Sequence, residues 1–180
     1  MHRIVLLLSS LFLAGAVFAG PVLANPISPL SSALNERMLI MKDVAGYKAE
    51  HHLPVEDLVR EQKVVALAQE EARDTGLDPQ SVVPFIQAQM DVAKAIQYRY
   101  LADWLSSPEQ NWRPKNLDDV RKAISDHDKV ILNSIGQRLL VGRFSEQDKS
   151  EIFGLLNAPN LSDADKSHLV NALSLIKRGT

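Results

Sequence analysis

The 180-residue chain contains no cysteine. Disulfide bonds, zinc–thiolate sites and thiol nucleophiles are therefore excluded, and the fold must be stable through packing alone. Glycine is scarce, with 8 residues, and no stretch alternates apolar and polar residues for long enough to predict a β-strand. The chain also lacks an excess of positive charge, since 20 basic residues stand against 22 acidic ones. That balance argues against nucleic acid or an anionic membrane as the main partner.

The first residues have the pattern of a secretory signal peptide. His2 and Arg3 precede an apolar run over residues 4–19, and small or modest residues follow up to Ala24. We predict cleavage after Ala24. The apolar run is shorter than the ~20 residues of a spanning helix, which disfavours the alternative of a membrane anchor. The expected mature chain, residues 25–180, is a single domain located in the periplasm or outside the cell, with no membrane contact.

The mature sequence predicts helices throughout, so the expected fold class is an all-α bundle of about six helices. Pro54 and Gly76 mark helix ends, and Pro84 indicates a delayed helix start. Ser145 and Ser162 each begin a capping box and should open a C-terminal helix. The predicted helices cover about residues 31–51, 55–75, 79–105 and 117–141, with two more within 145–178. The active-site helices would lie within about 31–141.

Several polar residues lie in the middle of apolar helix faces. Arg37 and Lys48 are eleven residues apart, close to three helical turns, so both lie on the apolar stripe of the first helix. The same placement recurs on the next three helices, at Arg60 with Asp57 one turn earlier, at Gln97, and at Arg121 with Asp128. Polar residues at such positions are predicted to be buried.

Each of these positions has an ordinary explanation. A single arginine at the edge of a stripe usually extends to solvent, and a buried glutamine usually satisfies a backbone group. Taken together, however, four inward-facing cations would cost several kcal/mol each if unpaired. Asp57, Glu61 and Asp128 cannot pair with all of them. A ligand with several negative charges, bound between the helices, accounts for the pattern, because arginine recognises carboxylates well.

The spacing of these residues resembles a known family, the all-α AroQ class of chorismate mutase. Residues 36–61 resemble its first two active-site helices, and residues 89–104 resemble its third. The signal peptide, the long C-terminal tail and the position of Arg121 are similar to the secreted gamma subclass. The resemblance covers about residues 34–140.

The resemblance implies an enzyme that converts chorismate to prephenate, a step of phenylalanine and tyrosine biosynthesis. The reaction is a one-step pericyclic rearrangement without a nucleophile or proton transfer, so no cofactor and no metal are expected. The protein would hold chorismate in its compact diaxial shape and stabilise negative charge on the breaking ether oxygen. The family also suggests a homodimer in which each site lies within one chain.

The resemblance also implies residue roles. The substrate-binding positions are Arg37, Lys48, Asp57, Arg60, Glu61, Ala93, Gln97 and Arg121. The three arginines would bind the two carboxylates of chorismate, and the two acids would contact its ring hydroxyl. Lys48 and Gln97 would donate hydrogen bonds to the ether oxygen and, with Arg60, form the catalytic set. Ala93 departs from the family, which usually has Ser or Thr there.

Two other functions fit part of the pattern. An exported helical protein that binds a small organic dianion without catalysis would also need the arginines. Lys48 and Gln97 favour the enzyme, since a carrier has no need to contact an ether oxygen. A structural or interaction module with solvent-directed arginines is the third possibility. It predicts that no small dianion raises the melting temperature.

Overall fold

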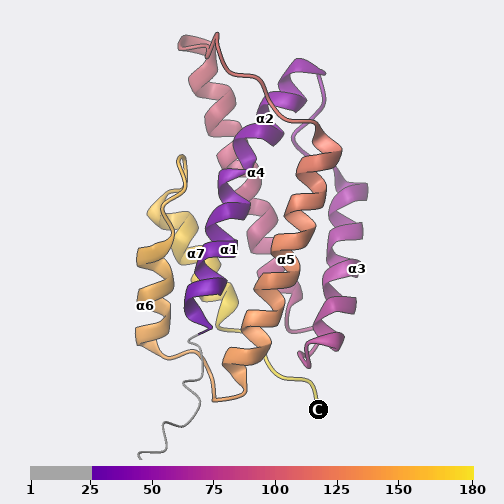
Figure 1. Ribbon diagram of the computed structural model, residues 1–180, viewed down its shortest axis with the longest axis vertical. Coiled ribbons are helices and arrows are strands. Elements are labelled where there is room, and N and C mark those ends of the chain that lie inside the picture. The colour runs from indigo at the N-terminus through magenta and orange to yellow at the C-terminus, as the bar shows by residue number, and fades with distance from the viewer. Residues whose placement is uncertain (1–25) are drawn as a thin grey trace, which may run out of the picture.

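The computed structural model describes residues 26–180 and confirms the all-α fold (Figure 1). The predicted signal peptide lies outside the described residues. The helices are α1 (Ile27–Leu39), α2 (Met41–Glu50), α3 (Leu58–Asp74), α4 (Val83–Ser106), α5 (Leu117–Leu139), α6 (Glu146–Leu155) and α7 (Asp163–Leu173). Within this part of the chain, no helix is both long and apolar enough to cross a membrane.

The first predicted helix is interrupted at Ile40, which separates α1 from α2. Backbone hydrogen bonds continue on both sides of Ile40, because its N–H donates to Glu36 at 3.1 Å and its carbonyl accepts from Val44 at 3.2 Å. The two helices therefore form one rod with a local irregularity (Figure 1). If this rod is counted once, the described residues contain the six helices that the sequence predicts.

Capping residues set most of the other helix starts. Asp57 caps α3, because its side chain accepts the backbone N–H of Arg60 at 3.0 Å. The helix therefore begins at Leu58 rather than directly after Pro54. The predicted start of the next helix at residue 79 is wrong, because residues 79–82 form turns and α4 begins at Val83. Pro84 thus lies in the first turn, where a missing N–H costs no helical hydrogen bond, and the delayed start is confirmed. The capping boxes at Ser145 and Ser162 are both present and open α6 and α7.

The C-terminal end differs from the prediction. The sequence predicts helix up to about residue 178, but α7 ends at Leu173. Beyond it the chain buries Ile176 and pairs with the segment between α3 and α4. Asp78 donates its N–H to the Lys177 carbonyl at 2.9 Å, and Gly179 donates to the Gly76 carbonyl at 3.0 Å. These tertiary hydrogen bonds replace the helical ones.

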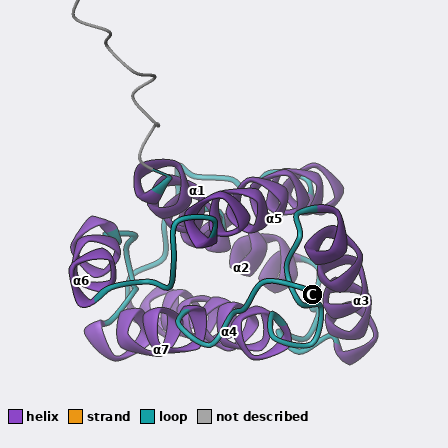
Figure 2. Cartoon of the chain, turned by 90° about the horizontal axis from the view of Figure 1, so that it is seen from below, coloured by secondary structure: helices purple, strands orange, loops and turns teal. Residues whose placement is uncertain are grey.

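The bundle is built from two facing pairs of helices. In the view along the bundle axis, α1 and α5 form one side of the cross-section and α4 and α7 form the opposite side. α3 and α6 lie on the two remaining flanks of the cross-section (Figure 2). α2 continues from α1 and packs against α4 and α5. The largest fully buried side chains of the core are Phe85, Ile27, Leu30, Leu34, Met38, Leu77, Ile96, Ile131, Leu132, Ile135, Ile152 and Leu156.

The linker before α5 is anchored by its aromatic residue. Trp112 packs against Trp104 with ring centroids 5.5 Å apart, and the Lys42 ammonium lies 4.7 Å from the Trp112 ring. Lys42 also pairs with Glu109 at 2.6 Å. Gly46 leaves the necessary room on α2, because a Cβ there would be 2.6 Å from the indole. The linker thus fixes where α5 begins.

Candidate active site

One cavity brings all the predicted site residues together. It has about 660 Å³ of empty space, part of which is its opening to solvent. Its polar lining comprises Arg37, Lys48, Asp57, Arg60, Glu61, Lys94, Gln97 and Arg121. Its apolar walls are Met41, Val44, Val55, Val64, Met90, Ala93, Leu117 and Ile124. The lining residues belong to α1–α5 and to the segment between α2 and α3.

Arg37 is buried in the wall of this cavity. Its side chain is only 5% exposed, and its Nε donates to the Asp128 carboxylate at 2.8 Å. A second, longer contact of 3.5 Å joins one terminal nitrogen to the backbone carbonyl of Gln89. A buried cation with a carboxylate partner on one edge can still bind an anion through its remaining N–H groups.

Lys48 lies further along the same rod, on α2, and is also buried. Its ammonium donates to the Val55 carbonyl at 2.6 Å, which leaves further N–H groups available. Burial lowers the pKa of Lys48 below the ordinary lysine value, and the neighbouring Asp57 carboxylate offsets part of that effect. The site therefore holds a poorly solvated cation, which would interact strongly with a negatively charged ligand atom.

Gln97 presents its amide nitrogen from α4. The side chain is buried, and Nε2 donates to the Ala93 carbonyl at 3.0 Å. The other contact of Nε2 is the Met41 sulfur at 3.7 Å, a weak acceptor that a ligand oxygen could replace. Oε1 has no hydrogen-bond partner among residues 26–180. Ala93 contributes only its methyl group and carbonyl here, so no side-chain hydroxyl is available at that position.

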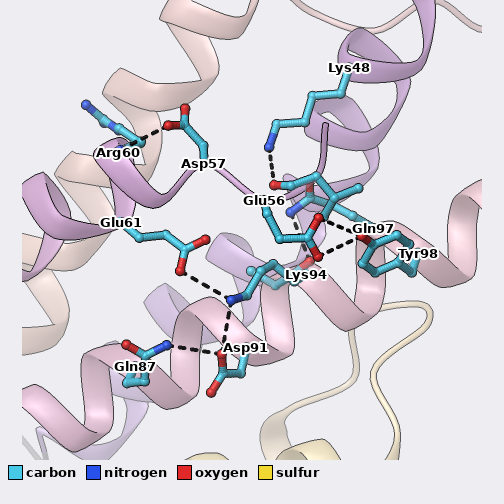
Figure 3. Close-up of polar contacts among 12 residues, drawn as sticks. Lys48, Glu56, Asp57, Arg60, Glu61, Gln87, Asp91, Lys94, Gln97 and Tyr98 are labelled. Atoms are coloured by element: carbon cyan, nitrogen blue, oxygen red, sulfur yellow. Dashed lines mark hydrogen bonds and ion pairs between the residues drawn. The ribbon is translucent and has the colours of Figure 1, made fainter. Parts of the chain in front are cut away.

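The remaining charged residues of the lining are less buried than Arg37, and Figure 3 shows four of them, Asp57, Arg60, Glu61 and Lys94. Arg121 of α5 contacts the Asp57 carboxylate at 3.4 Å. Glu61 pairs with Lys94 of α4 at 3.2 Å. Arg60 uses its backbone N–H for the Asp57 cap, while its guanidinium has no partner in the described part of the chain.

Lys94 is the polar lining residue that the sequence reasoning missed. Burial alone would lower the pKa of Lys94, but hydrogen bonds to Glu61 and Asp91 outweigh it and raise the pKa above the ordinary value. The helical spacing of Met90, Lys94 and Gln97 places all three on one face of α4, a signal that could have identified it.

The balance of charge in the cavity is positive. Five cations and two acids line it, so the lining carries a net charge of +3. Asp57, Glu61 and Asp128 pair with Arg121, Lys94 and Arg37, which leaves Lys48 and Arg60 without a carboxylate partner among residues 26–180. Within that range no group of His, Cys, Asp and Glu could hold a metal ion. Fold and cavity together define a helical-bundle protein with an internal cavity of positive charge.

The comparisons with known proteins agree with this class. Residues 29–98 match the family described as chorismate mutase type II. A monofunctional chorismate mutase of Enterobacter agglomerans is 49% identical over 177 residues, which cover 98% of each chain. A secreted chorismate mutase of Yersinia pestis is 44% identical over 170 residues, or 94% of this chain and 89% of the relative. The chain belongs to the type II chorismate mutase family.

Solved structures give the same fold. The crystal structure of the secreted chorismate mutase from Yersinia pestis matches with a TM-score of 0.78 and 41% identity, covering 83% of this chain and 97% of that one. A chorismate mutase from Burkholderia phymatum has a TM-score of 0.72 at 18% identity, covers 83% of this chain and 96% of that one, and shares the fold. The described residues therefore have the fold of solved chorismate mutases.

Proposed function

We propose that the cationic cavity is the site at which this chorismate mutase rearranges chorismate to prephenate. The observation that carries the proposal is the combination of Lys48 and Gln97 with three arginines in one cavity. Carboxylate binding alone needs the arginines. The two further N–H donors fit an oxygen that gains negative charge as its bond to carbon breaks.

The arginines serve to position the substrate. Chorismate carries two carboxylates, and Arg37, Arg60 and Arg121 reach the cavity from α1, α3 and α5. Cations on three different helices can hold the two carboxylates at a fixed separation, which favours the compact diaxial conformer over the extended ones. This restriction lowers the entropic part of the barrier. The apolar walls exclude water and strengthen these charge interactions.

Lys48 and Gln97 stabilise the transition state. The ether oxygen gains negative charge only as the carbon–oxygen bond breaks, so donors aimed at it act mainly on the transition state. Lys48 supplies a full charge in a desolvated position, and Gln97 supplies a neutral N–H. Asp57 and Glu61 line the cavity, where they can accept a hydrogen bond from the ring hydroxyl. A Ser or Thr hydroxyl at position 93 would contact a substrate carboxylate. Because this chain has Ala93, the arginines alone make the carboxylate contacts.

The experiment that tests the function is the loss of chorismate absorbance in the presence of purified protein. An enzyme converts chorismate with turnover, and its rate is proportional to protein concentration. A dianion carrier would bind chorismate, and so raise the melting temperature, without consuming it. The comparisons give the carrier hypothesis no support, since the relatives are chorismate mutases.

The compartment and assembly also belong to this proposal. Residues 1–24 would be a cleaved signal peptide, and residues 25–180 would form one catalytic domain in the periplasm or outside the cell. Relatives named secreted chorismate mutase support export. A homodimer, with a complete site in each chain, is consistent with the single-chain lining of the cavity.

A further inference from the structure

The partner of the buried Arg37 guanidinium lies outside the cavity. Arg37 lines the cavity, whereas Asp128 of α5 does not and lines an adjoining groove between α3 and α5. The Arg37 side chain is 5% exposed and the Asp128 side chain 19%. Asp128 can therefore influence a ligand in the cavity only through Arg37 or through its own charge.

The contacts of Arg37 leave one edge of its guanidinium free. A guanidinium has five N–H groups in a rigid planar fork. Nε–H is taken by Asp128 at 2.8 Å, and one terminal nitrogen is 3.5 Å from the Gln89 carbonyl. The other terminal nitrogen has no partner in the described part of the chain. The edge formed by the two terminal nitrogens is thus available for a bidentate hydrogen-bonded contact with a carboxylate.

We propose that Asp128 is a positioning residue that fixes the Arg37 guanidinium so that its outer edge faces the substrate carboxylate. The inference rests on the proposed function of the cavity. Without Asp128, the Nε–H of Arg37 would lose its acceptor in a place that water barely reaches. The side chain would then turn to find another partner, and the carboxylate clamp would lose its geometry.

The charge of Asp128 alone predicts the opposite effect. A carboxylate close to an anion site repels the ligand, so its removal should tighten substrate binding if Coulomb forces decided the matter. A purely structural role, as a tie between α1 and α5, predicts a loss of stability without a specific change in KM. Apolar core residues such as Leu34 and Ile135 already hold these helices together. The three roles are therefore distinguishable by kinetics.

The test compares Asp128→Asn with Asp128→Leu, two side chains of similar shape. Asparagine keeps an oxygen acceptor for Nε–H, and leucine removes it. We expect Asp128→Leu to raise KM for chorismate roughly tenfold or more, the scale on which orienting partners of binding groups act in metal sites. The kcat should change little, because the carboxylate contact is the same in the ground and transition states. Asp128→Asn should recover most of the loss.

A double-mutant cycle separates positioning from other roles. In an Arg37→Ala background, Asp128→Leu should add no further loss, because the group that it positions is gone. Asp126→Ala is the matched control, since Asp126 lies on the same helix, is exposed and pairs with Lys122 on the surface of α5. It should leave both kinetic constants unchanged. Circular dichroism verifies that each variant folds, and Asp128→Ala replaces Asp128→Leu if leucine does not fit.

Three results would overturn the inference. The first is a KM for chorismate that is unchanged or lower in Asp128→Leu and Asp128→Ala. The second is a KM of Asp128→Asn that is as high as in these two variants. The third is a loss from Asp128→Leu that is as large in the Arg37→Ala background as in the wild type. Turnover of chorismate by the wild type and by Asp126→Ala tests the proposed function separately. An inactive wild type would overturn that function and this inference with it.

Discussion

The ammonium of Lys48 lies in a place that disfavours its charge. Its ammonium is buried beside the Val55 carbonyl, and desolvation lowers its pKa below the ordinary lysine value. The Asp57 carboxylate opposes this effect but does not cancel it. A cation of this kind interacts strongly with developing negative charge, because little solvent screens it.

The lowered pKa predicts an alkaline limit to activity. The ammonium is the active form, so its charge is lost as pH rises through a pKa below that of an exposed lysine. We expect kcat/KM to fall on the alkaline side in this range, since kcat/KM reports the free enzyme. A pH profile of kcat/KM with chorismate measures it. A profile that stays flat up to the ordinary lysine pKa would contradict the assignment.

Replacing Lys48 by methionine removes the charge and keeps most of the volume. We expect kcat to fall on the order of 10²-fold or more, by comparison with the loss of an oxyanion donor. The loss should appear mainly in kcat, because the ether oxygen gains its charge only in the transition state. Lys63→Met, on the exposed face of α3, is the control and should change neither constant. A wild-type kcat in Lys48→Met would remove Lys48 from the mechanism.

Gln97 donates without needing a proton from solution. Its Nε2 is held by the Ala93 carbonyl, so one N–H stays directed at the weakly binding Met41 sulfur. Gln97→Glu should be active only where the new acid is protonated, since a carboxylate would repel the developing charge. Its rate should therefore rise as pH falls, while the wild type stays nearly flat over the acidic and neutral range. The measurement is kcat against pH, and a pH-independent variant with full activity would count against a role for Gln97.

At the scale of elements, the linker decides where Arg121 enters the site. Residues 107–116 cross from α4 to α5 and are anchored by Trp112 over Gly46. Arg121 follows in the second turn of α5, where it contacts Asp57. The position of this arginine therefore depends on a contact between the linker and α2 whose two residues, Trp112 and Gly46, do not line the cavity.

Gly46→Ala tests that dependence. The new Cβ would be 2.6 and 2.7 Å from two carbons of the Trp112 ring, so the indole and the linker must move. We expect a destabilisation of about 1–3 kcal/mol, typical of overpacking, and a higher KM because Arg121 shifts with the start of α5. Thermal unfolding and chorismate kinetics measure the two effects, and fluorescence reports the linker directly, as Trp104 and Trp112 are the only tryptophans.

Gly154→Ala is the matched control for this variant. It lies on α6, where a Cβ would meet nothing within 4 Å. Alanine favours a helix over glycine by roughly 1 kcal/mol, so this variant should be as stable as the wild type or more so. If Gly46→Ala behaves in the same way, the contact between the linker and α2 does not control the site.

At the scale of the whole molecule, the C-terminal helices support the helices that carry the site. α6 packs on α1, and α7 packs on α4. Polar ties add to this packing, since Arg99 of α4 pairs with Asp165 of α7, and Asn35 of α1 accepts from the backbone of residues 157 and 158. The C-terminal helices α6 and α7 thus stabilise the positions of α1, which carries Arg37, and α4, which carries Gln97.

The whole chain also carries the prediction of export. We expect the mature protein to begin at Asn25 and to be found in the periplasm or the medium. N-terminal sequencing of the protein from fractionated cells measures both. A variant with a charged residue in the apolar run, such as Leu7→Arg, should retain the intact chain in the cytoplasm. An uncleaved form starting at Met1 as the main cytoplasmic species of the wild-type chain would contradict the prediction.

The sequence by itself determined the elements and the polar residues that they bury. The positions of Arg37, Lys48 and Gln97 on apolar faces predicted their burial, because the period of a helix fixes which side chains share a face. The same prediction is wrong for Arg60 and Arg121, which are only half-buried. The starts of α6 and α7 followed from capping boxes, which are satisfied within four residues. These features are local, so no knowledge of the packing was needed.

Only the tertiary structure decided which groups meet. The pairing of Arg37 with Asp128, 91 residues apart, depends on α1 lying against α5, and helix periodicity does not specify a neighbour. The end of α7 at Leu173 has the same origin, because residues beyond it exchange helical hydrogen bonds for bonds to Gly76 and Asp78. The place of Lys94 in the cavity likewise required α3 to bring Glu61 against α4. Contacts between distant segments depend on how the surfaces of two helices pack together. The residue pattern of one helix does not specify which other helix packs against it.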